Sequence, residues 1–480
     1  MLFNSLEFII FLPIVFLMYW FLKKSLRWQN LWVVFVSYLF YGWWDWRFLF
    51  LIALTTFCSY SSGLLIEQYK RRRYIQRWIS ASNIILNLTI LGVFKYYNFF
   101  AENLKVLFDI FGFHLDWATL HILLPVGISF YTFQALSYTI DVYQGKLNAT
   151  KDIIAFFAFI SFFPQLVAGP IERATNLLPQ FLKKRSFNYK QAVDGSRQIL
   201  WGFFKKVVIA DNCASTLMPI WDNYDQMNGI ALLIGGLLFT FQIYGDFSGY
   251  SDIAIGTARL FGINLMKNFN FPYFSRSIPE FWRRWHISLM TWFRDYVYFP
   301  LGGSRCSKAK IIRNVFVVWG ISGLWHGANW TFICWGLYHG TLLAFYNLFN
   351  VNTKYNHVVA YGKFFPSIKE LMQMIMTFML AVVGWIIFRA ENISQAGMYI
   401  YRMFTSPFEG KSVPSISYTF AFIIILMISE WIQRDKDFAL QINHKGIFRY
   451  RPVRWLLYMT LLFVILVFGG SQSQFIYFQF

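Results

Sequence analysis

Two histidines are suited to proton transfer, one in a mostly apolar stretch and the other in a stretch of aromatic and basic residues. His326 lies in "ISGLWHGANW" at 321–330, and His286 lies in "FWRRWHIS" at 281–288. Imidazole is the side chain whose charge changes near neutral pH, and it serves as a general base in many enzymes. Because burial disfavours the charged form, an imidazole in apolar surroundings is predicted to stay neutral and available as a base at pH 7.

Helix packing offers a second explanation for His326. Gly323 and Gly327 flank it, and small residues four apart let another helix approach closely, so an interhelical hydrogen bond is the structural alternative. The same glycine spacing recurs around His339. At about 100° per residue, His326 and His339 would face different ways on one straight helix, so they are not predicted to form a local pair. The other four histidines fall in or beside polar loops: His114, His121, His357 and His444.

The elements that must position these side chains are membrane helices. Hydrophobic residues make up 57% of the 480 and charged residues 14%, whereas about a quarter of the residues in an ordinary soluble domain are charged. We predict an all-α polytopic membrane protein with a single integral membrane domain over 1–480 and about ten to twelve hydrophobic segments. The apolar runs lie at 8–22, 30–44, 48–66, 78–94, 121–143, 153–171, 229–262, 311–349, 367–388, 416–432 and 455–470.

The net charge of +20 reports membrane topology and not nucleic-acid binding, because the basic residues lie in short loops between apolar runs. The basic loops at 23–27 and 70–77 are therefore predicted to be cytoplasmic, and the "WWDW" turn at 43–46 to face outside. Basic residues before the last apolar run place the C-terminus outside as well. Nothing in the charge pattern predicts a nucleic-acid partner.

Two stretches interrupt the pattern of spans. Pro164, Gly169 and Pro170 break helical hydrogen bonding in "SFFPQLVAGPIER" (161–173), which predicts a re-entrant element, with a kinked full span as the alternative. The segment 274–310 alternates aromatic and basic residues, too many charges for a lipid-facing span. It is predicted to lie at the cytoplasmic interface or to line an inward cavity; the alternative is an amphipathic helix with His286 merely at headgroup level.

Other polar groups give weaker signals. Asp246, Ser248 and Asp252 lie in the apolar stretch "YGDFSGYSD", where each is either a donor-site contact or a buried hydrogen-bond partner. The four cysteines lack metal-ligand spacing, so no metal site is predicted. The sequence also lacks a G-x-x-x-x-G-K-[ST] phosphate loop, which argues against an ATP-driven pump.

Five blocks of sequence, in order, resemble the signature blocks of the membrane-bound O-acyltransferase family. The opening "MLFNSLEFIIFLPIVFLMYWF" and the closing "FGGSQSQFIYFQF" are similar to its bacterial branch, typified by the membrane protein of alginate O-acetylation. The match runs almost from end to end. The blocks are "LPVGISFYTFQALSYTIDVYQG" (124–145), "FFPQLVAGPIER" (162–173), "FSGYSDIAIGTARLFGI" (247–263), "PEFWRRWHISLMTWFRDYVYFPLGG" (279–303) and "GLWHGANWTFICWGLYHG" (323–340).

This resemblance implies roles for particular residues. In the family a histidine within a hydrophobic helix is the defining catalytic residue, and the "LWHG" block places it at His326. A second histidine of the "RRWHIS" block corresponds to His286; lipid-modifying relatives often carry asparagine there, so His286 is open to orienting the acceptor, polarising the acyl carbonyl or returning a proton to the leaving thiolate. The implied architecture is a helical bundle around a funnel, with re-entrant and interfacial helices. Candidate donor or substrate contacts are Asp246, Ser248, Arg283, Arg284, Arg294 and Asn329.

From these residues and the resemblance we expect an O-acyltransferase of the bacterial inner membrane. It would move acetyl from a cytoplasmic thioester, with acetyl-CoA as the donor substrate, toward hydroxyls of an extracellular or periplasmic polysaccharide such as alginate. Arginines of the 274–310 segment could bind the donor's phosphates, although positive-inside bias explains them equally well. The resemblance implies an extracytoplasmic acetyltransferase partner that completes transfer. The alternatives are D-alanyl transfer to teichoic acid, peptidoglycan O-acetylation and, in another class, a proton-coupled transporter.

Overall fold

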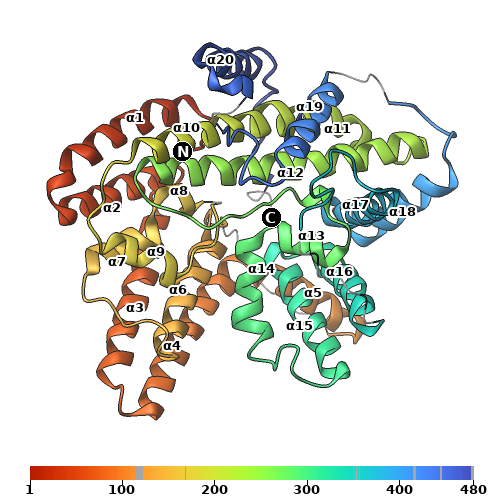
Figure 1. Cartoon of the computed structure of the whole chain (residues 1–480). Helices are drawn as coiled ribbons and strands as arrows, with labels where there is room; N and C mark the ends of the chain where they lie inside the picture. The colour runs from red at the N-terminus through yellow and green to blue at the C-terminus, as the bar shows by residue number, and fades with distance from the viewer. Residues whose placement is uncertain are drawn as a thin grey trace. The chain divides into compact units, whose positions relative to one another are not determined.

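The computed structural model describes residues 1–113, 123–167, 169–349, 351, 355, 357–413, 418–443 and 446–476. Within these residues the secondary structure consists of helices and one isolated β-bridge, between Met227 and Lys411 (Figure 1). The predicted all-α class is therefore confirmed. His114, His121 and His444 lie outside the described residues.

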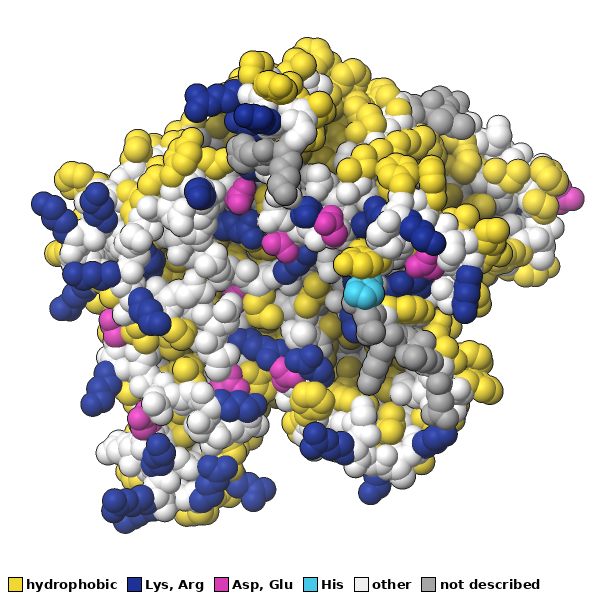
Figure 2. Space-filling model, viewed as in Figure 1, with side chains coloured by type: hydrophobic (Ala, Val, Ile, Leu, Met, Phe, Trp, Pro, Cys, Tyr) yellow, Lys and Arg dark blue, Asp and Glu magenta, His cyan; other side chains and the backbone are white. Residues whose placement is uncertain are grey.

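Five helical segments among the described residues are long and apolar enough to cross a membrane, which agrees with a multi-pass integral membrane protein. The predicted count of ten to twelve segments stays a prediction. Large hydrophobic side chains are exposed on four of these segments, whereas Gly229–Leu260 is mostly buried, and hydrophobic patches are visible on the surface in Figure 2. The five segments are Leu6–Lys24, Phe48–Gln68, Arg73–Ile110, Gly229–Leu260 and Ile368–Arg389.

The chain packs into two compact units, residues 1–192 with 257–266 and residues 193–256 with 267–480. The prediction of a single domain over 1–480 stays a prediction. The first unit contains α1 (Leu6–Phe21), η1 (Leu22–Lys24), α2 (Leu26–Gly42), α3 (Phe48–Gln68), α4 (Arg73–Leu91), η2 (Gly92–Tyr96), α5 (Tyr97–Ile110), α6 (Ile128–Tyr143), α7 (Ile153–Ser161), α8 (Phe163–Leu166) and α9 (Ala174–Phe181).

The predicted interruption within 153–171 is confirmed. α7 is nine residues long and α8 has four, so α7 extends about 14 Å, less than half of a hydrocarbon core of about 30 Å. The break frees the carbonyl of Phe159, which accepts hydrogen bonds from the side-chain amides of Gln134 (2.8 Å) and Gln165 (2.9 Å). Side-chain partners of this kind allow a helix to stop in apolar surroundings.

The second unit holds the segments with the candidate histidines. The helix bounds are α10 (Tyr189–Phe203, whose first residues belong to the first unit), η3 (Phe204–Ala210), α11 (Asp211–Asp222), α12 (Gly229–Leu260, whose last residues belong to the first unit), η4 (Pro272–Phe274), α13 (Ile278–Arg284), α14 (Ile287–Phe293), η5 (Arg294–Tyr298), α15 (Lys308–His326), α16 (Trp330–Leu348), α17 (Ile368–Arg389), α18 (Ile393–Thr405), α19 (Thr419–Ile432), η6 (Gly446–Arg449) and α20 (Arg451–Val467).

A long helical segment at 189–222 was not predicted as an apolar run. It is formed by α10, the π-helical η3 and α11, and it runs beside α12 (Figure 1). The two approach closely: a Cβ atom on Gly202 would lie 2.6 Å from the carbonyl oxygen of Gly249. Charged residues interrupt its hydrophobic pattern, yet Lys205 and Lys206 are buried against acidic side chains of α12.

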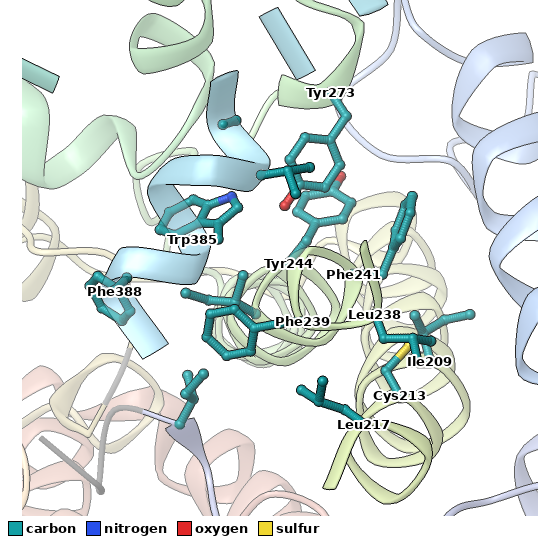
Figure 3. Packing of buried hydrophobic residues seen from close by; sticks show 14 of the residues in the cluster. Ile209, Cys213, Leu217, Leu238, Phe239, Phe241, Tyr244, Tyr273, Trp385 and Phe388 are labelled. Atoms are coloured by element: carbon teal, nitrogen blue, oxygen red, sulfur yellow. The ribbon is translucent and has the colours of Figure 1, made fainter. Parts of the chain in front are cut away.

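Aromatic and aliphatic side chains fill the core of the second unit. In Figure 3, Phe239 and Tyr244 of α12 lie between the aromatic rings of α17 on one side and the aliphatic face of η3 and α11 on the other. Close packing of this kind fixes the positions of the helices that carry the candidate site. Members of this core include Ile209, Cys213, Leu217, Leu238, Phe241, Tyr273, Trp385 and Phe388.

The apolar run 311–349 forms a hairpin of two helices, α15 and α16, which corrects one inference from the sequence. His326 ends α15 and His339 lies in α16, so the angle expected for one straight helix does not apply to them. The predicted close approach through glycines is confirmed, because a Cβ atom on Gly336 would lie 2.3 Å from the carbonyl oxygen of Trp319.

Candidate active site

His326 is the last residue of α15, where the chain leaves the helix through the extended Gly327. Its side chain is buried, with 6% exposed. Three aromatic rings stand edge-on to the imidazole, with ring centroids 4.9 Å away for Trp335, 5.0 Å for Trp325 and 5.3 Å for Phe388. An imidazole in such surroundings is shielded from bulk water, as a buried general base requires.

His286 lies at the junction of α13 and α14 in the left-handed conformation, with φ 45° and ψ 51°. This conformation is uncommon for residues other than glycine and is often found at functional sites. The side chain is fully buried, and burial lowers its pKa to about 3, so the imidazole is neutral at pH 7. Its Nδ1 lies 3.1 Å from Oδ1 of Asn268, and the ring of Phe247 lies 4.6 Å away between centroids.

Trp325 connects the two histidines. Its ring lies 5.0 Å from that of His326 and 6.0 Å from that of His286, edge-on to both. The structure therefore places the two predicted catalytic residues against the same indole, although 40 positions separate them in the sequence. Trp325 is 4% exposed, so this part of the second unit is shielded from solvent.

His339 occupies a cage of aromatic side chains next to this arrangement. The indole N–H of Trp282 lies 3.3 Å from Nδ1 of His339 and donates to it, and a Cβ atom on Gly384 would lie 2.6 Å from its Nε2. The ring of Trp335 contacts both His339 (5.2 Å) and His326 (4.9 Å) between centroids. His339 is therefore held as a packing and hydrogen-bonding group of the hairpin.

Phe247 of α12 contacts His286, and Asp246 and Ser248 are its neighbours in the sequence. Asp246 is buried and forms an ion pair with Lys206 at 2.8 Å, while its other oxygen accepts a hydrogen bond from the backbone N–H of Ile476 at 2.7 Å. These contacts agree with the interpretation of Asp246 as a buried hydrogen-bond partner. Within the described residues, the buried hydroxyl of Ser248 has no hydrogen-bond partner. Its predicted role as a substrate contact stays a prediction.

The arginines of the 274–310 segment differ in their surroundings. Arg284 forms an ion pair with Glu280 at 2.9 Å, whereas the side chains of Arg283 and Arg294 are exposed. Arg294 also contacts the carboxylate of its neighbour Asp295 at 2.7 Å. By exposure alone, Arg283 and Arg294 are more accessible to an anionic ligand than the half-buried Arg284.

Glu280 lies between two arginines near the start of this segment, and they favour its ionised carboxylate. Burial by itself would favour the protonated carboxyl, but hydrogen bonds from Arg276 and the charges of Arg276 and Arg284 outweigh burial and lower the pKa of Glu280. Both arginines lie about 3 Å from its carboxylate. This part of the chain is held by its own ion pairs.

Asn329 caps α16. Its carbonyl oxygen accepts a hydrogen bond from the N–H of Thr331 at 3.0 Å, and its amide donates to the carbonyl of Glu391 at 2.7 Å. Both ends of the side chain are thus engaged in fixing the hairpin next to His326. Its predicted role as a donor or substrate contact stays a prediction.

Sequence reasoning did not select Asn268, Trp325 or Trp335, which surround the two histidines. A signal for Asn268 was present: it is a polar residue of the short segment that joins two signature blocks, 247–263 and 279–303. Its contact with His286 spans 18 positions and cannot be read from a helical period. The two tryptophans resemble ordinary core residues in the sequence.

Comparison with known proteins identifies the chain's relatives. The model of the membrane-bound O-acyltransferase family matches residues 150–388, which include both His286 and His326. A Pseudomonas aeruginosa protein named "Probable alginate O-acetylase" is 43% identical over 84% of this chain and 75% of its own length. The chain belongs to the membrane-bound O-acyltransferase family. As a member, it is an O-acyltransferase embedded in a membrane by several helices.

Other membrane-bound O-acyltransferases match this chain along its whole length. A Pseudomonas putida protein, also named "Probable alginate O-acetylase", is 38% identical over 100% of both chains. The "Peptidoglycan O-acetyltransferase" of Helicobacter pylori is 34% identical over 100% of this chain and 98% of its own. Membership of the family fixes the class of reaction. The catalytic roles of His326 and His286 remain predictions.

Proposed function

We propose that this O-acyltransferase moves an acetyl group from cytoplasmic acetyl-CoA across the bacterial inner membrane toward hydroxyls of an exported polysaccharide such as alginate. The observation that carries the proposal is the pair of buried histidines on one indole, His286 and His326 about Trp325. The names of the relatives that cover the chain support acetyl as the group and a glycan as the acceptor.

His326 is the general base in this proposal. Its neutral imidazole takes the proton from the acceptor's hydroxyl group while the oxygen of that hydroxyl attacks the carbonyl carbon of the donor thioester. The C=O electron pair moves onto the carbonyl oxygen. The tetrahedral intermediate then re-forms the C=O bond and breaks the C–S bond. The imidazolium of His326 returns the proton to the thiolate, so a hydroxyl and a thioester become an ester and a thiol. Proton removal of this kind contributes about 10²–10⁴-fold to the rate.

The basic segment 274–310 is the proposed entry side for the donor. Coenzyme A carries phosphates, and a guanidinium binds phosphate through charge-assisted hydrogen bonds. Arg283 and Arg294 are exposed, which favours them over the half-buried Arg284. A separate extracytoplasmic acetyltransferase is proposed to complete transfer to the polymer.

Peptidoglycan O-acetylation is a second candidate function, because the Helicobacter pylori relative with that name covers the whole chain. D-alanyl transfer has weaker support: the "Teichoic acid D-alanyltransferase" of Bacillus subtilis is 30% identical over 55% of this chain. A proton-coupled transporter would need His326 and acids such as Asp246 and Asp252 to relay protons. The contacts argue against this, since both acids are ion-paired with lysines at 2.8 and 2.6 Å.

The test uses membranes that contain the chain together with its extracytoplasmic partner. Labelled acetyl-CoA is supplied on the cytoplasmic side, and label is measured on alginate, peptidoglycan and teichoic acid in separate reactions. Label on alginate that requires His326 supports the proposal, and label on peptidoglycan alone selects the second candidate. Solute flux without label on any glycan would overturn the acyltransfer proposal.

A further inference from the structure

We infer that Asn268 fixes His286 in the tautomer with hydrogen on Nδ1, so that Nε2 presents a lone pair and binds the acceptor by accepting a hydrogen bond. The inference deepens the proposed function and rests on it. It assigns a positioning role to a residue that sequence reasoning did not select. It also selects one of the three roles that the sequence left open for His286.

The orientation of the Asn268 amide follows from its neighbours. The backbone N–H of Ser288, which can only donate, lies 3.4 Å from Oδ1 of Asn268, and the hydroxyl of Ser288 lies 2.8 Å from the same atom. On the other side, Nδ2 of Asn268 donates to the hydroxyl of Ser251 at 3.0 Å. The atom that faces Ser288 must therefore be the carbonyl oxygen. A flipped amide would place the NH2 group of Asn268 against the N–H of Ser288, so that two donors would face each other.

The tautomer of His286 follows from that orientation. Its Nδ1 lies 3.1 Å from Oδ1 of Asn268, and an oxygen acceptor requires a hydrogen on the facing nitrogen. In a neutral imidazole one nitrogen donates and the other accepts, so a hydrogen on Nδ1 leaves the lone pair on Nε2. Asn268 is fully buried, and its backbone carbonyl accepts from the N–H of Ile287 at 2.9 Å, which holds the two segments together.

This tautomer restricts what His286 can do. Polarising the acyl carbonyl would require an N–H directed at the acyl oxygen, and protonating the thiolate would require a proton that neutral Nε2 does not carry. Accepting a hydrogen bond from the acceptor remains. Because the hydrogen of the reacting hydroxyl passes to His326, the hydrogen bound by His286 is a second polar hydrogen of the acceptor. The low pKa of His286, about 3 through burial, supports a group that accepts a hydrogen bond and not a proton.

The test compares Asn268→Leu, Asn268→Asp and a matched control, Asn212→Leu. Leucine removes the oxygen that selects the tautomer, so kcat is expected to fall roughly 10- to 100-fold with the KM for acetyl-CoA unchanged. Aspartate keeps an acceptor opposite Nδ1 and should recover most of that loss. Asn212 is an equally buried asparagine whose amide donates to the carbonyls of Val208 and Phe468 (both 2.8 Å), so its loss tests folding without touching His286.

A spectroscopic measurement tests the tautomer without any assay of transfer. Nitrogen-15 spectra of histidine-labelled protein, assigned by comparison with His286→Asn, should show a protonated Nδ1 and an unprotonated Nε2 for His286, and a mixture in Asn268→Leu. A protonated Nε2 in the unaltered protein would overturn the inference, as would an Asn268→Leu enzyme as active as Asn212→Leu. If the unaltered protein transfers no acetyl but shows the expected tautomer, the proposed function fails and the tautomer assignment stands.

Discussion

Nζ of Lys206 lies 2.8 Å from Oδ1 of Asp246, and both side chains are at most 3% exposed. The same ammonium lies 2.9 Å from Asp211. One buried lysine thus holds two carboxylates, from α11 and from α12. Breaking a buried ion pair by removing one partner costs about 3–5 kcal/mol, because the remaining charge is left uncompensated.

We therefore expect Lys206→Met to reduce stability more than Asp246→Asn does. The methionine variant leaves two buried carboxylates without their cation, whereas in Asp246→Asn the lysine still pairs with Asp211. Thermal unfolding in detergent, followed by size-exclusion chromatography, measures the order. A Lys206→Met protein as stable as the unaltered one would contradict the buried ion-pair network.

His326→Ala should lower acetyl transfer about 10²–10⁴-fold without reducing the amount of protein in the membrane, because the base is lost while the helices remain. Initial rates with labelled acetyl-CoA, normalised to folded protein, measure the loss. His339→Ala is the matched control, since His339 is an equally buried histidine of the same hairpin. It should lose stability and keep transfer per folded molecule. Full activity of His326→Ala would leave only the packing explanation for this residue.

His286→Asn should retain measurable transfer, whereas His326→Asn should not. Asparagine offers an N–H toward Asn268 and an oxygen toward the acceptor, and it tolerates the left-handed conformation that His286 adopts. At position 326 asparagine cannot accept and release a proton near neutral pH. Rates of both variants are compared at equal amounts of protein with the partner present. Equal inactivity would mean that both histidines are chemically essential.

The topology predicts which loops a membrane-impermeant thiol reagent reaches. In a chain whose other cysteines are replaced by serine, Cys306 and an Arg72→Cys variant should label from the cytoplasm. A Trp46→Cys variant should label from outside, and its position is favourable because Trp46 is 74% exposed. Labelling of all three from the same side, or with the sides exchanged, would contradict both the topology and the proposed cytoplasmic entry of the donor.

The sequence predicted those features that local pattern encodes. Hydropathy located helices at the apolar runs, and the glycines around His326 and His339 predicted a close approach by another helix, without identifying which helices would meet. The helix break after His326 was missed because hydropathy is continuous across it, even though Asn329 is a good N-cap residue.

Long-range pairing explains the other differences. No role was assigned to Lys205 and Lys206 from the sequence, because their acidic partners in α12 become visible only once the helices pack side by side. The left-handed backbone conformation at position 286 could not be predicted from the sequence, because the residue there is histidine and not glycine. The contact of His286 with Asn268 likewise depends on how two irregular segments meet.

The π-helical winding of residues 204–210 has a consequence for changes in chain length. A π-turn holds more residues than an α-turn, so deleting one residue there would let the segment wind as a regular α-helix. Lys206 and Asp211 are five residues apart, which is about one turn of a π-helix, and one deletion would leave them four apart, about one turn of an α-helix. We therefore expect homologous chains to tolerate the loss of one residue between Lys206 and Asp211, and not the loss of two, which would turn Asp211 away from Lys206.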